Sequence, residues 1–311
     1  MDTTVWKKYS EEFGARFTKR QKIRFQNALI EDFKQFGYTC DIVQGKSFLS
    51  RANNLLFGNL KHAKTVIAVP YDTPARVLWP KSYFFPLDGM STSNKSLVST
   101  FAPVLILYLA VMALMYGVEG LTTTLTSVAL GFVLVLILFI FYLMLHGVSN
   151  KKNYNRNSAS IYAAYKIAES LDKDTRRQVA FLFLDANKTK HLGAKAAAED
   201  FLRQGKNPNV IVLNTFAKGM MQIGYNAQNK KLAQDLNKTF ANAQRLKMIS
   251  LTNEMRNSSP MEHFTKAVTI GAGVLDKKNR LCIMNTGTGK DVEIDEENIH
   301  KVIEMVQAYV K

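Results

Sequence analysis

The turn that follows residues 179–184 carries the side chains best suited to chemistry. The apolar run FLFL ends at Asp185, and Asn187 and Lys188 follow before an alanine-rich helical segment. In parallel α/β sheets, catalytic groups usually stand where the carboxyl end of a strand leads into a helix. An amide and a cation cannot serve there as a general base. The turn therefore predicts a polar, positively charged cleft in place of an acid–base pair.

Two carboxylates and two histidines could join this turn. Asp72 and Asp185 each follow an apolar strand, where they either support a polar cleft or make local turn hydrogen bonds. His191 and His263 could approach the same edge. The chain has no His-x₃-His or Cys-x₂-Cys pair, so it lacks a local metal motif. A rearranged single-metal site of His191, His263 and Asp72 or Asp185 is an alternative.

Strands and helices alternate along most of the chain. Strands are predicted at 38–43, 53–60, 65–72, 177–185, 207–216 and 280–287, and helices at 15–37, 158–171, 193–205, 229–246 and 295–311. The glycine-containing stretches 271–276 and 285–291 are predicted turns. This alternation predicts a single three-layer α/β domain with a mixed, mostly parallel central sheet.

Two long apolar runs interrupt this pattern, at about residues 97–118 and 127–148. Each has the roughly 20 residues that a helix needs to cross a hydrocarbon core of about 30 Å. Soluble helices of that length seldom lack a polar face. We therefore predict a transmembrane hairpin over 96–150, which divides one domain into residues 1–95 and 151–311.

The basic residues suggest an orientation. All 41 Lys and Arg residues lie outside the hairpin, which predicts a two-helix protein of the cell membrane with both termini in the cytoplasm. The formal net charge of +16 could reflect RNA binding, but no nucleic-acid module is visible and no specific nucleic-acid partner is expected. Attraction to anionic lipid headgroups accounts for the charge equally well.

Several cations could converge near the turn at Asp185. They are Lys151, Lys152, Arg156, Lys188 and Lys190. Together they form either an anionic-ligand pocket, for a phosphate, a carboxylate or a lipid headgroup, or a solvated basic face next to the bilayer.

The order of the segments resembles the zinc-dependent exopeptidase family of bacterial leucyl aminopeptidases and glutaminyl cyclases, whose fold also occurs in the transferrin receptor. The family's FvffDaEE-GLlGSka segment is similar to FLFLDANKTKHLGAKA, and its Asn-Ala-Ser-Gly helix start to NYNRNSASIYAAYKIA. Its Ser-Asp-His-x-x-Phe motif falls near SSPMEHF, and its His-Thr-x-x-Asp motif on NTGTGKD. The resemblance implies that fold, and in the family two zinc ions activate water for peptide hydrolysis.

The zinc-binding positions of the family carry other residues in this chain. The resemblance places Pro70 at the position of the first His ligand and Met261 at that of the last His. Asn187 falls at the catalytic Glu, Lys188 at the adjacent Glu ligand and Asn214 at the next Asp ligand. The region of the bridging carboxylate contains Asn153, Asn155 and Arg156. The Asp that supports the first His is kept as Asp72.

The resemblance therefore implies an inactive relative without bound zinc. It would act as a binding or scaffolding module at the cytoplasmic membrane face, in contact with the bilayer, another membrane protein or an anionic ligand. The alternative is an active membrane aminopeptidase or amidase that uses the rearranged single zinc site. The oligomeric state cannot be inferred from these patterns.

Overall fold

The chain divides into two compact units, Met1–Gly89 with Ser149–Lys311, and Met90–Val148. The computed structural model describes residues 1–48, 50–76, 83–86, 147–187, 190–239 and 245–311, and residues 105–106, 108–109, 128, 131–139 and 142 between them. The sheet and the candidate site both belong to the first unit.

The strands of the described residues form one ten-stranded sheet, in the order β1-β2-β5-β3-β6-β9-β10-β4 with β7 and β8 branching from β9. They are β1 Cys40–Lys46, β2 Arg51–Phe57, β3 Thr65–Pro70, β4 Tyr83–Phe84, β5 Val179–Leu184, β6 Asn209–Leu213, β7 Met220–Tyr225, β8 Lys247–Ser250, β9 Ala267–Leu275 and β10 Leu281–Ile283. The central strands β5, β3, β6 and β9 are parallel, and antiparallel strands flank them. The predicted mixed α/β fold is confirmed.

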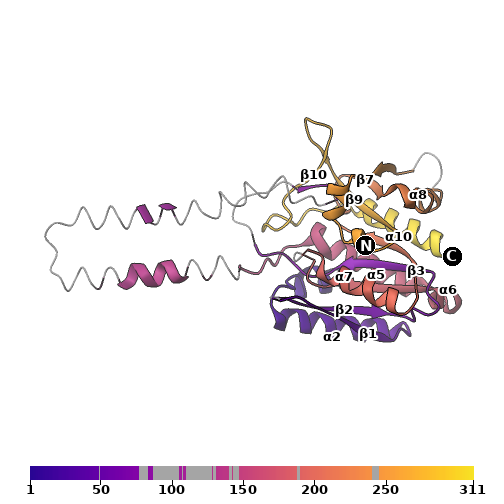
Figure 1. The fold of residues 1–311 in the computed structure, drawn as a ribbon, viewed down its shortest axis with the longest axis horizontal. Coiled ribbons are helices and arrows are strands. Elements are labelled where there is room, and N and C mark those ends of the chain that lie inside the picture. Colours follow the sequence, from indigo (N-terminus) through magenta and orange to yellow (C-terminus); the bar gives the residue numbers. More distant parts are fainter. Residues whose placement is uncertain are drawn as a thin grey trace. The chain divides into compact units, whose positions relative to one another are not determined.

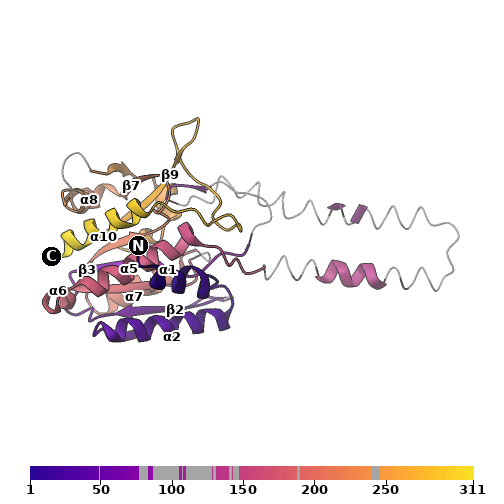
Figure 2. The ribbon, with the colours of Figure 1, turned by 180° about the vertical axis from the view of Figure 1, so that it is seen from behind.

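Helices cover both faces of this sheet (Figures 1 and 2). The described helices are α1 Thr3–Lys7, η1 Lys8–Glu12, α2 Lys19–Gln35, η2 Tyr154–Ser158, α5 Ala159–Ser170, α6 Lys173–Gln178, α7 Leu192–Arg203, η3 Ala227–Asn229, α8 Lys230–Asn237, α9 Asn253–Asn257, η5 Pro260–His263 and α10 Glu296–Val310. The larger hydrophobic core includes residues of α2, α5, α8 and α10, whereas α7 and η5 contribute to the second core. Because both faces are covered, every residue of β3 and β5 is buried.

Local capping sets the ends of two helices that the sequence predicts well. α2 begins with a capping box between Thr18 and Gln21, and Gly37, at φ 83°, follows its last turn. Asp295 is the N-cap residue of α10, and its side chain accepts a hydrogen bond from the Glu297 N–H.

Two predictions between 229 and 276 differ from the structure. α8 ends at Asn237, where the Asn237 side chain hydrogen-bonds the N–H and the carbonyl of Leu246, each at 2.8 Å; residues 240–244 of the predicted helix lie outside the described residues. The predicted turn at 271–276 is wrong, because residues 271–275 lie inside β9. Gly271 is required by close packing, since a Cβ there would stand 2.7 Å from the Phe85 ring.

Most of the two apolar runs predicted to cross a membrane lies outside the described residues. Among the residues that the structure does describe, no helix has both the length and the apolar character needed to span a bilayer. Residues 131–139 of the second run are helical, and their side chains are apolar and mostly exposed. Ala75 and Ser149 pair as an antiparallel bridge, so the chain segment before the two apolar runs meets the segment after them.

Candidate functional site

The carboxyl ends of three parallel strands bring the predicted site residues to one edge of the sheet. Asp72, Asp185 and Asn214 follow β3, β5 and β6, and each is at most 4% exposed. The π-helix η2 lies beside them, because the Asn157 Nδ2 donates to the Pro70 carbonyl at 2.7 Å. Residues from three strand ends and one helix start therefore share this edge of the sheet. Below, the name cleft refers to this edge and to these buried residues.

Asp72 lies close to a buried cation, Arg16. The Arg16 guanidinium donates to the backbone carbonyls of Tyr71 at 2.7 Å and Tyr9 at 3.1 Å, and to that of Phe13. Burial lowers the pKa of Arg16 to about 9, and the charge of Asp72 opposes that shift. The Asp72 charge therefore stands beside a cation of the chain itself.

Asp185 is also occupied by protein groups. One of its oxygens accepts from the Lys22 ammonium, and the other from the Asn53 N–H at 3.1 Å. The Asn54 Oδ1 accepts from the Asp185 N–H at 2.9 Å, and the Asn54 Nδ2 donates to the Gly193 carbonyl at 2.8 Å. These bonds tie the end of β5 to α2, β2 and α7, so Asp185 has a structural role.

Hydrogen bonds of Asn187 to Asp72 and His191 hold the turn after Asp185. The Asn187 N–H donates to the Asp72 Oδ1 at 3.0 Å, and the Asn187 Oδ1 lies 2.7 Å from the His191 Nδ1. Because an amide oxygen only accepts, this contact places a proton on Nδ1. His191 adopts a left-handed conformation at φ 51° just before α7. Lys188, the other residue predicted here, lies outside the described residues.

Burial sets the charge of His191. It is the main cause that lowers the pKa of His191 to about 4, followed by repulsion from His263 and Arg156. His191 is therefore neutral at pH 7, as a buried ring next to cations should be. Backbone groups of Asn257 and Ser258 also interact with the ring and oppose the lowering of its pKa.

His191 should make the protein less stable in acid. The unfolded ring binds its proton near pH 6.5, and the folded ring binds it only near pH 4. The unfolded state thus holds more protons in this interval, and stability falls as pH drops through it, by about 3 kcal/mol for this group. Unfolding of the purified protein between pH 7 and pH 4 should show a shallower loss of stability for His191→Asn. An equally steep loss in that variant would contradict the assignment, and His62→Asn, at an exposed ring, is the matched control.

The start of η2 is held by a buried acid, Asp291. Its two oxygens accept from the N–H groups of Asn155 at 3.0 Å and Arg156 at 3.1 Å, and the Asn155 Oδ1 accepts from the Ala217 N–H at 2.9 Å. Burial raises the pKa of Asp291 to about 7, although these N–H groups and the Arg156 charge oppose the rise. Asp291 is the acid of the segment that resembles His-Thr-x-x-Asp, and here it positions Asn155 and Arg156.

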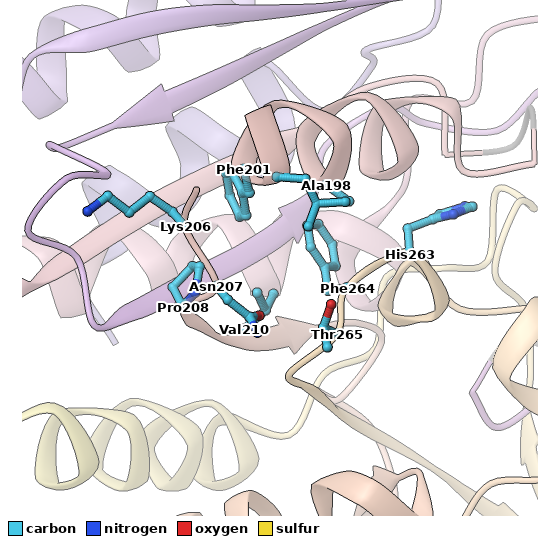
Figure 3. A pocket seen from close by; sticks show the side chains of 10 residues that line it. Ala198, Phe201, Lys206, Asn207, Pro208, Val210, His263, Phe264 and Thr265 are labelled. Carbon is cyan, nitrogen blue, oxygen red and sulfur yellow. The ribbon is translucent and has the colours of Figure 1, made fainter. Parts of the chain in front are cut away.

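His263 stands near His191 but is not paired with it. The two ring centroids are 6.3 Å apart, and the His263 Nε2 lies 3.1 Å from a Glu262 oxygen without hydrogen-bond geometry. His263 also lines a pocket of about 20 Å³ between α7 and β6, where its ring points away from Phe201 and Phe264 (Figure 3). That volume holds about one water molecule, so the pocket is too small for a substrate.

The residues present do not fit a two-zinc centre. The Pro70 carbonyl is already hydrogen-bonded, Met261 is 1% exposed in the second hydrophobic core, and Asn155, Asn187 and Asn214 offer amides where the resemblance calls for carboxylates. No group of three His, Cys, Asp or Glu side chains in the described ranges could hold a metal ion, which applies equally to the rearranged single-metal set.

The cleft retains polar atoms that the protein does not satisfy. Within the part of the chain that the structure describes, Arg156 Nε, Asn157 Oδ1 and Asn214 Nδ2 are buried and have no hydrogen-bond partner. Buried polar atoms of this kind are normally paired, by protein, water or a ligand. The arrangement can therefore bind a polar molecule, with Arg156 supplying positive charge.

Solved structures of several bacterial enzymes share this architecture. They include the glutaminyl cyclase of Porphyromonas gingivalis (TM-score 0.61, 11% identity, 99% of this chain and 95% of that chain covered). A leucine aminopeptidase precursor from Bacteroides thetaiotaomicron has a TM-score of 0.58 and 14% sequence identity, with 99% of this chain and 94% of that chain covered. The LapA aminopeptidase of Legionella pneumophila has a TM-score of 0.58 and 11% sequence identity, with 100% of this chain and 68% of that chain covered. No family model and no curated protein sequence matches the chain.

The chain thus has the fold of zinc-dependent exopeptidases and glutaminyl cyclases. The fold-level part of the sequence resemblance is confirmed. At these identities the fold is shared without a shared activity being shown, so the function has to be argued from the cleft.

Proposed function

We propose that this protein is a membrane-anchored, catalytically inactive exopeptidase-like protein that acts as a binding or scaffolding module at the cytoplasmic membrane face. The observation that carries the proposal is the state of the cleft carboxylates. Asp185 is paired with Lys22, Asp72 lies beside Arg16, and Asp291 holds the backbone of η2. Carboxylates held in this way are not available as metal ligands or as a general base.

An anionic ligand suits the cleft best. Arg156 is half-buried, and its Nε has no hydrogen-bond partner among the described residues. The Asn214 Nδ2, just after β6, is a second donor that those residues leave unsatisfied. Donors and positive charge at the carboxyl edge of a sheet are the usual means of binding a phosphate or carboxylate group. That group could belong to a small molecule, a lipid headgroup or a membrane partner.

Inorganic phosphate is the simplest probe of this cleft. Titration of the purified full-length protein should give saturable binding, weakened about tenfold in Arg156→Gln through loss of a charge-assisted contact. Arg20→Gln removes an exposed cation elsewhere and should bind as wild type does. Equal affinity in wild type and Arg156→Gln would contradict an anion site in the cleft.

The membrane anchor is supported by the described part of the second apolar run. The helical residues 131–139 expose apolar side chains on every side, including Phe132 at 71% and Val135 at 64%. A helix without a polar face needs a surrounding apolar medium. The two runs, their lengths and the absence of cations between Lys95 and Lys151 support a hairpin in a bilayer.

Cysteine labelling in intact cells tests this topology. With Cys40 and Cys282 replaced by serine, Thr123→Cys at the predicted outer tip should react with a membrane-impermeant maleimide. Lys231→Cys, at an exposed position of α8, should react only after the cells are lysed. Labelling of both positions in intact cells, or of neither, would contradict the proposed orientation.

A further inference from the structure

The strands β7 and β9 lie at the other end of the sheet from β1 and β2 (Figure 1), and β8 pairs with β7. A second cavity is lined by residues of β7 and β8. Its volume is about 260 Å³. The described residues that line it are Phe84, Phe85, Gln222, Lys247, Ile249, Met255, Asn279, Arg280 and Leu281. None of the cleft residues discussed above is among them.

The register of the three strands explains why there is space. Gly271 of β9 pairs with Gln222 of β7, which pairs with Lys247 of β8, so the three positions form one row across the sheet. Alternation along β9 and β7 puts Thr269 and Gly224 on the same face as that row. This face of β7 and β9 therefore has few large side chains.

The opposite face of the same strands is filled. Val268, Ile270 and Ala272 of β9 and Met221 and Ile223 of β7 belong to the larger hydrophobic core. The glycines account for the difference between the two faces, because a residue without a side chain leaves space for a close neighbour or for a cavity.

Phe85 covers the glycine end of the row. A Cβ on Gly271 would stand 2.7 Å and 2.8 Å from two atoms of the Phe85 ring, so the aromatic ring rests directly on the backbone of β9. Phe84 forms part of the adjoining wall, with the Arg280 guanidinium 3.9 Å from its ring centroid. The walls are thus largely apolar, with aromatic rings at one end.

A polar side chain that lines the cavity is unsatisfied. Gln222 is 1% exposed, and its Oε1 has no hydrogen-bond partner among the described residues. A buried polar atom without a partner destabilises the fold, and a ligand that hydrogen-bonds it removes that cost. The last torsion of a Gln side chain is soft, so the amide can turn either its oxygen or its NH₂ toward a bound group.

The charge at the rim favours an anion. Lys247 is exposed at the end of the row, and no acidic residue is among the described residues that line the cavity. Arg280 is paired with Asp276 through two contacts of 2.8 Å and 3.0 Å to one oxygen, so Lys247 supplies the unbalanced charge.

We propose that this cavity is a ligand site for a compact organic acid that has an aromatic or branched apolar body and a hydroxyl group. The apolar body fills the space between Phe85, Ile249 and Met255, the hydroxyl pairs with the Gln222 amide, and the carboxylate faces Lys247. The volume lies just below the roughly 300–1,000 Å³ typical of pockets for drug-sized ligands, which limits the ligand to a small metabolite.

Three small probes test the proposal by calorimetry on the detergent-solubilised full-length protein. 3-Hydroxyphenylacetate has both polar groups, phenylacetate lacks the hydroxyl, and 3-hydroxyphenethylamine (m-tyramine) carries a cation in place of the acid. We expect saturable one-to-one binding of 3-hydroxyphenylacetate in the millimolar range or tighter, and about tenfold weaker binding of the other two.

Two variants separate the contacts. Gln222→Met keeps the size of the side chain and should remove the advantage of 3-hydroxyphenylacetate over phenylacetate. Lys247→Gln, at an exposed position of β8, should remove the preference for the acid over the amine. Arg156→Gln changes the cleft and should leave all three affinities unchanged, so that failure of the cleft proposal and of this one can be told apart.

Three results would overturn the proposal. The first is that no probe binds saturably at millimolar concentration. The second is that neither Gln222→Met nor Lys247→Gln changes the relative affinities. The third is that Arg156→Gln weakens binding while Lys247→Gln does not, which would place the probes in the cleft.

Discussion

Replacing Arg16 by methionine should lower the free energy of unfolding by about 3–5 kcal/mol, the cost of breaking a buried, hydrogen-bonded charge. The carbonyls of Tyr9, Phe13 and Tyr71 would lose their donor, and Asp72 would lose its neighbouring cation. These carbonyls belong to the N-terminal segment and to the end of β3, so the change should separate that segment from the sheet. In a domain of this size the loss corresponds to a drop in Tm on the order of 10 °C.

Thermal unfolding of the purified protein measures this effect, and Arg20→Met is the matched control. Arg20 is exposed in the first turn of α2, and its replacement should change stability by at most about 0.5 kcal/mol. Arg16→Lys should retain only part of the stability that Arg16→Met loses, because one ammonium cannot reach all the carbonyls that the forked guanidinium contacts. Equal Tm values for Arg16→Met and Arg20→Met would show that the buried guanidinium does not hold the N-terminal segment.

Gly193→Ala should destabilise the protein by about 3 kcal/mol, although the same change inside an ordinary helix stabilises by up to about 1 kcal/mol. An alanine Cβ at this position would stand 2.2 Å from the Asp185 carbonyl oxygen and 2.4 Å from the Asn54 Oδ1. The first turn of α7 would have to move away from β5. That movement would also break the 2.8 Å hydrogen bond from Asn54 to the Gly193 carbonyl.

The sign of this effect makes the test decisive. Chemical unfolding of Gly193→Ala should give a lower midpoint than wild type, whereas helix propensity alone predicts a higher one. Lys195→Ala, two residues further along α7 at an exposed position, controls for a change of helix sequence and should be nearly neutral. A stabilised Gly193→Ala protein would mean that α7 does not pack against the end of β5 as described.

The strongly patterned elements of the fold could be predicted from the sequence, and the elements around the second cavity could not. β3 and β5 are continuous apolar runs, and α2 and α10 have both a helical period and capping residues. The sequence pattern does not predict β7, β8 or the first half of β9, and it predicts a turn at Gly271 and Gly273. In β9 the glycines instead reflect close packing by Phe85 and by the Cys282 backbone, which only the tertiary structure reveals.

The positions of the cleft residues could be predicted, but their partners could not. Asp72, Asp185, Asn187 and Asn214 lie at one edge because they follow parallel strands. Arg16 lies far from these residues in sequence, before α2, and a single cation in a loop gives no periodic signal.

Lys22 and Asp291 were missed for a similar reason. Lys22 lies on the first turns of α2 between other basic residues, where a solvated charge is the ordinary expectation. The segment of Asp291 was noticed, but its carboxylate could be placed on η2 only once the backbone of η2 was known.

Zinc content and aminopeptidase activity of one preparation test the central claim, that this exopeptidase fold no longer performs exopeptidase chemistry. Protein purified without chelator and dialysed against zinc should retain far less than one equivalent of the metal. It should also release no N-terminal residue from a panel of peptides, because Asn187 and Asn214 stand where the resemblance calls for carboxylates. Retention of one or two equivalents of zinc, together with peptide hydrolysis that a chelator abolishes, would contradict the account.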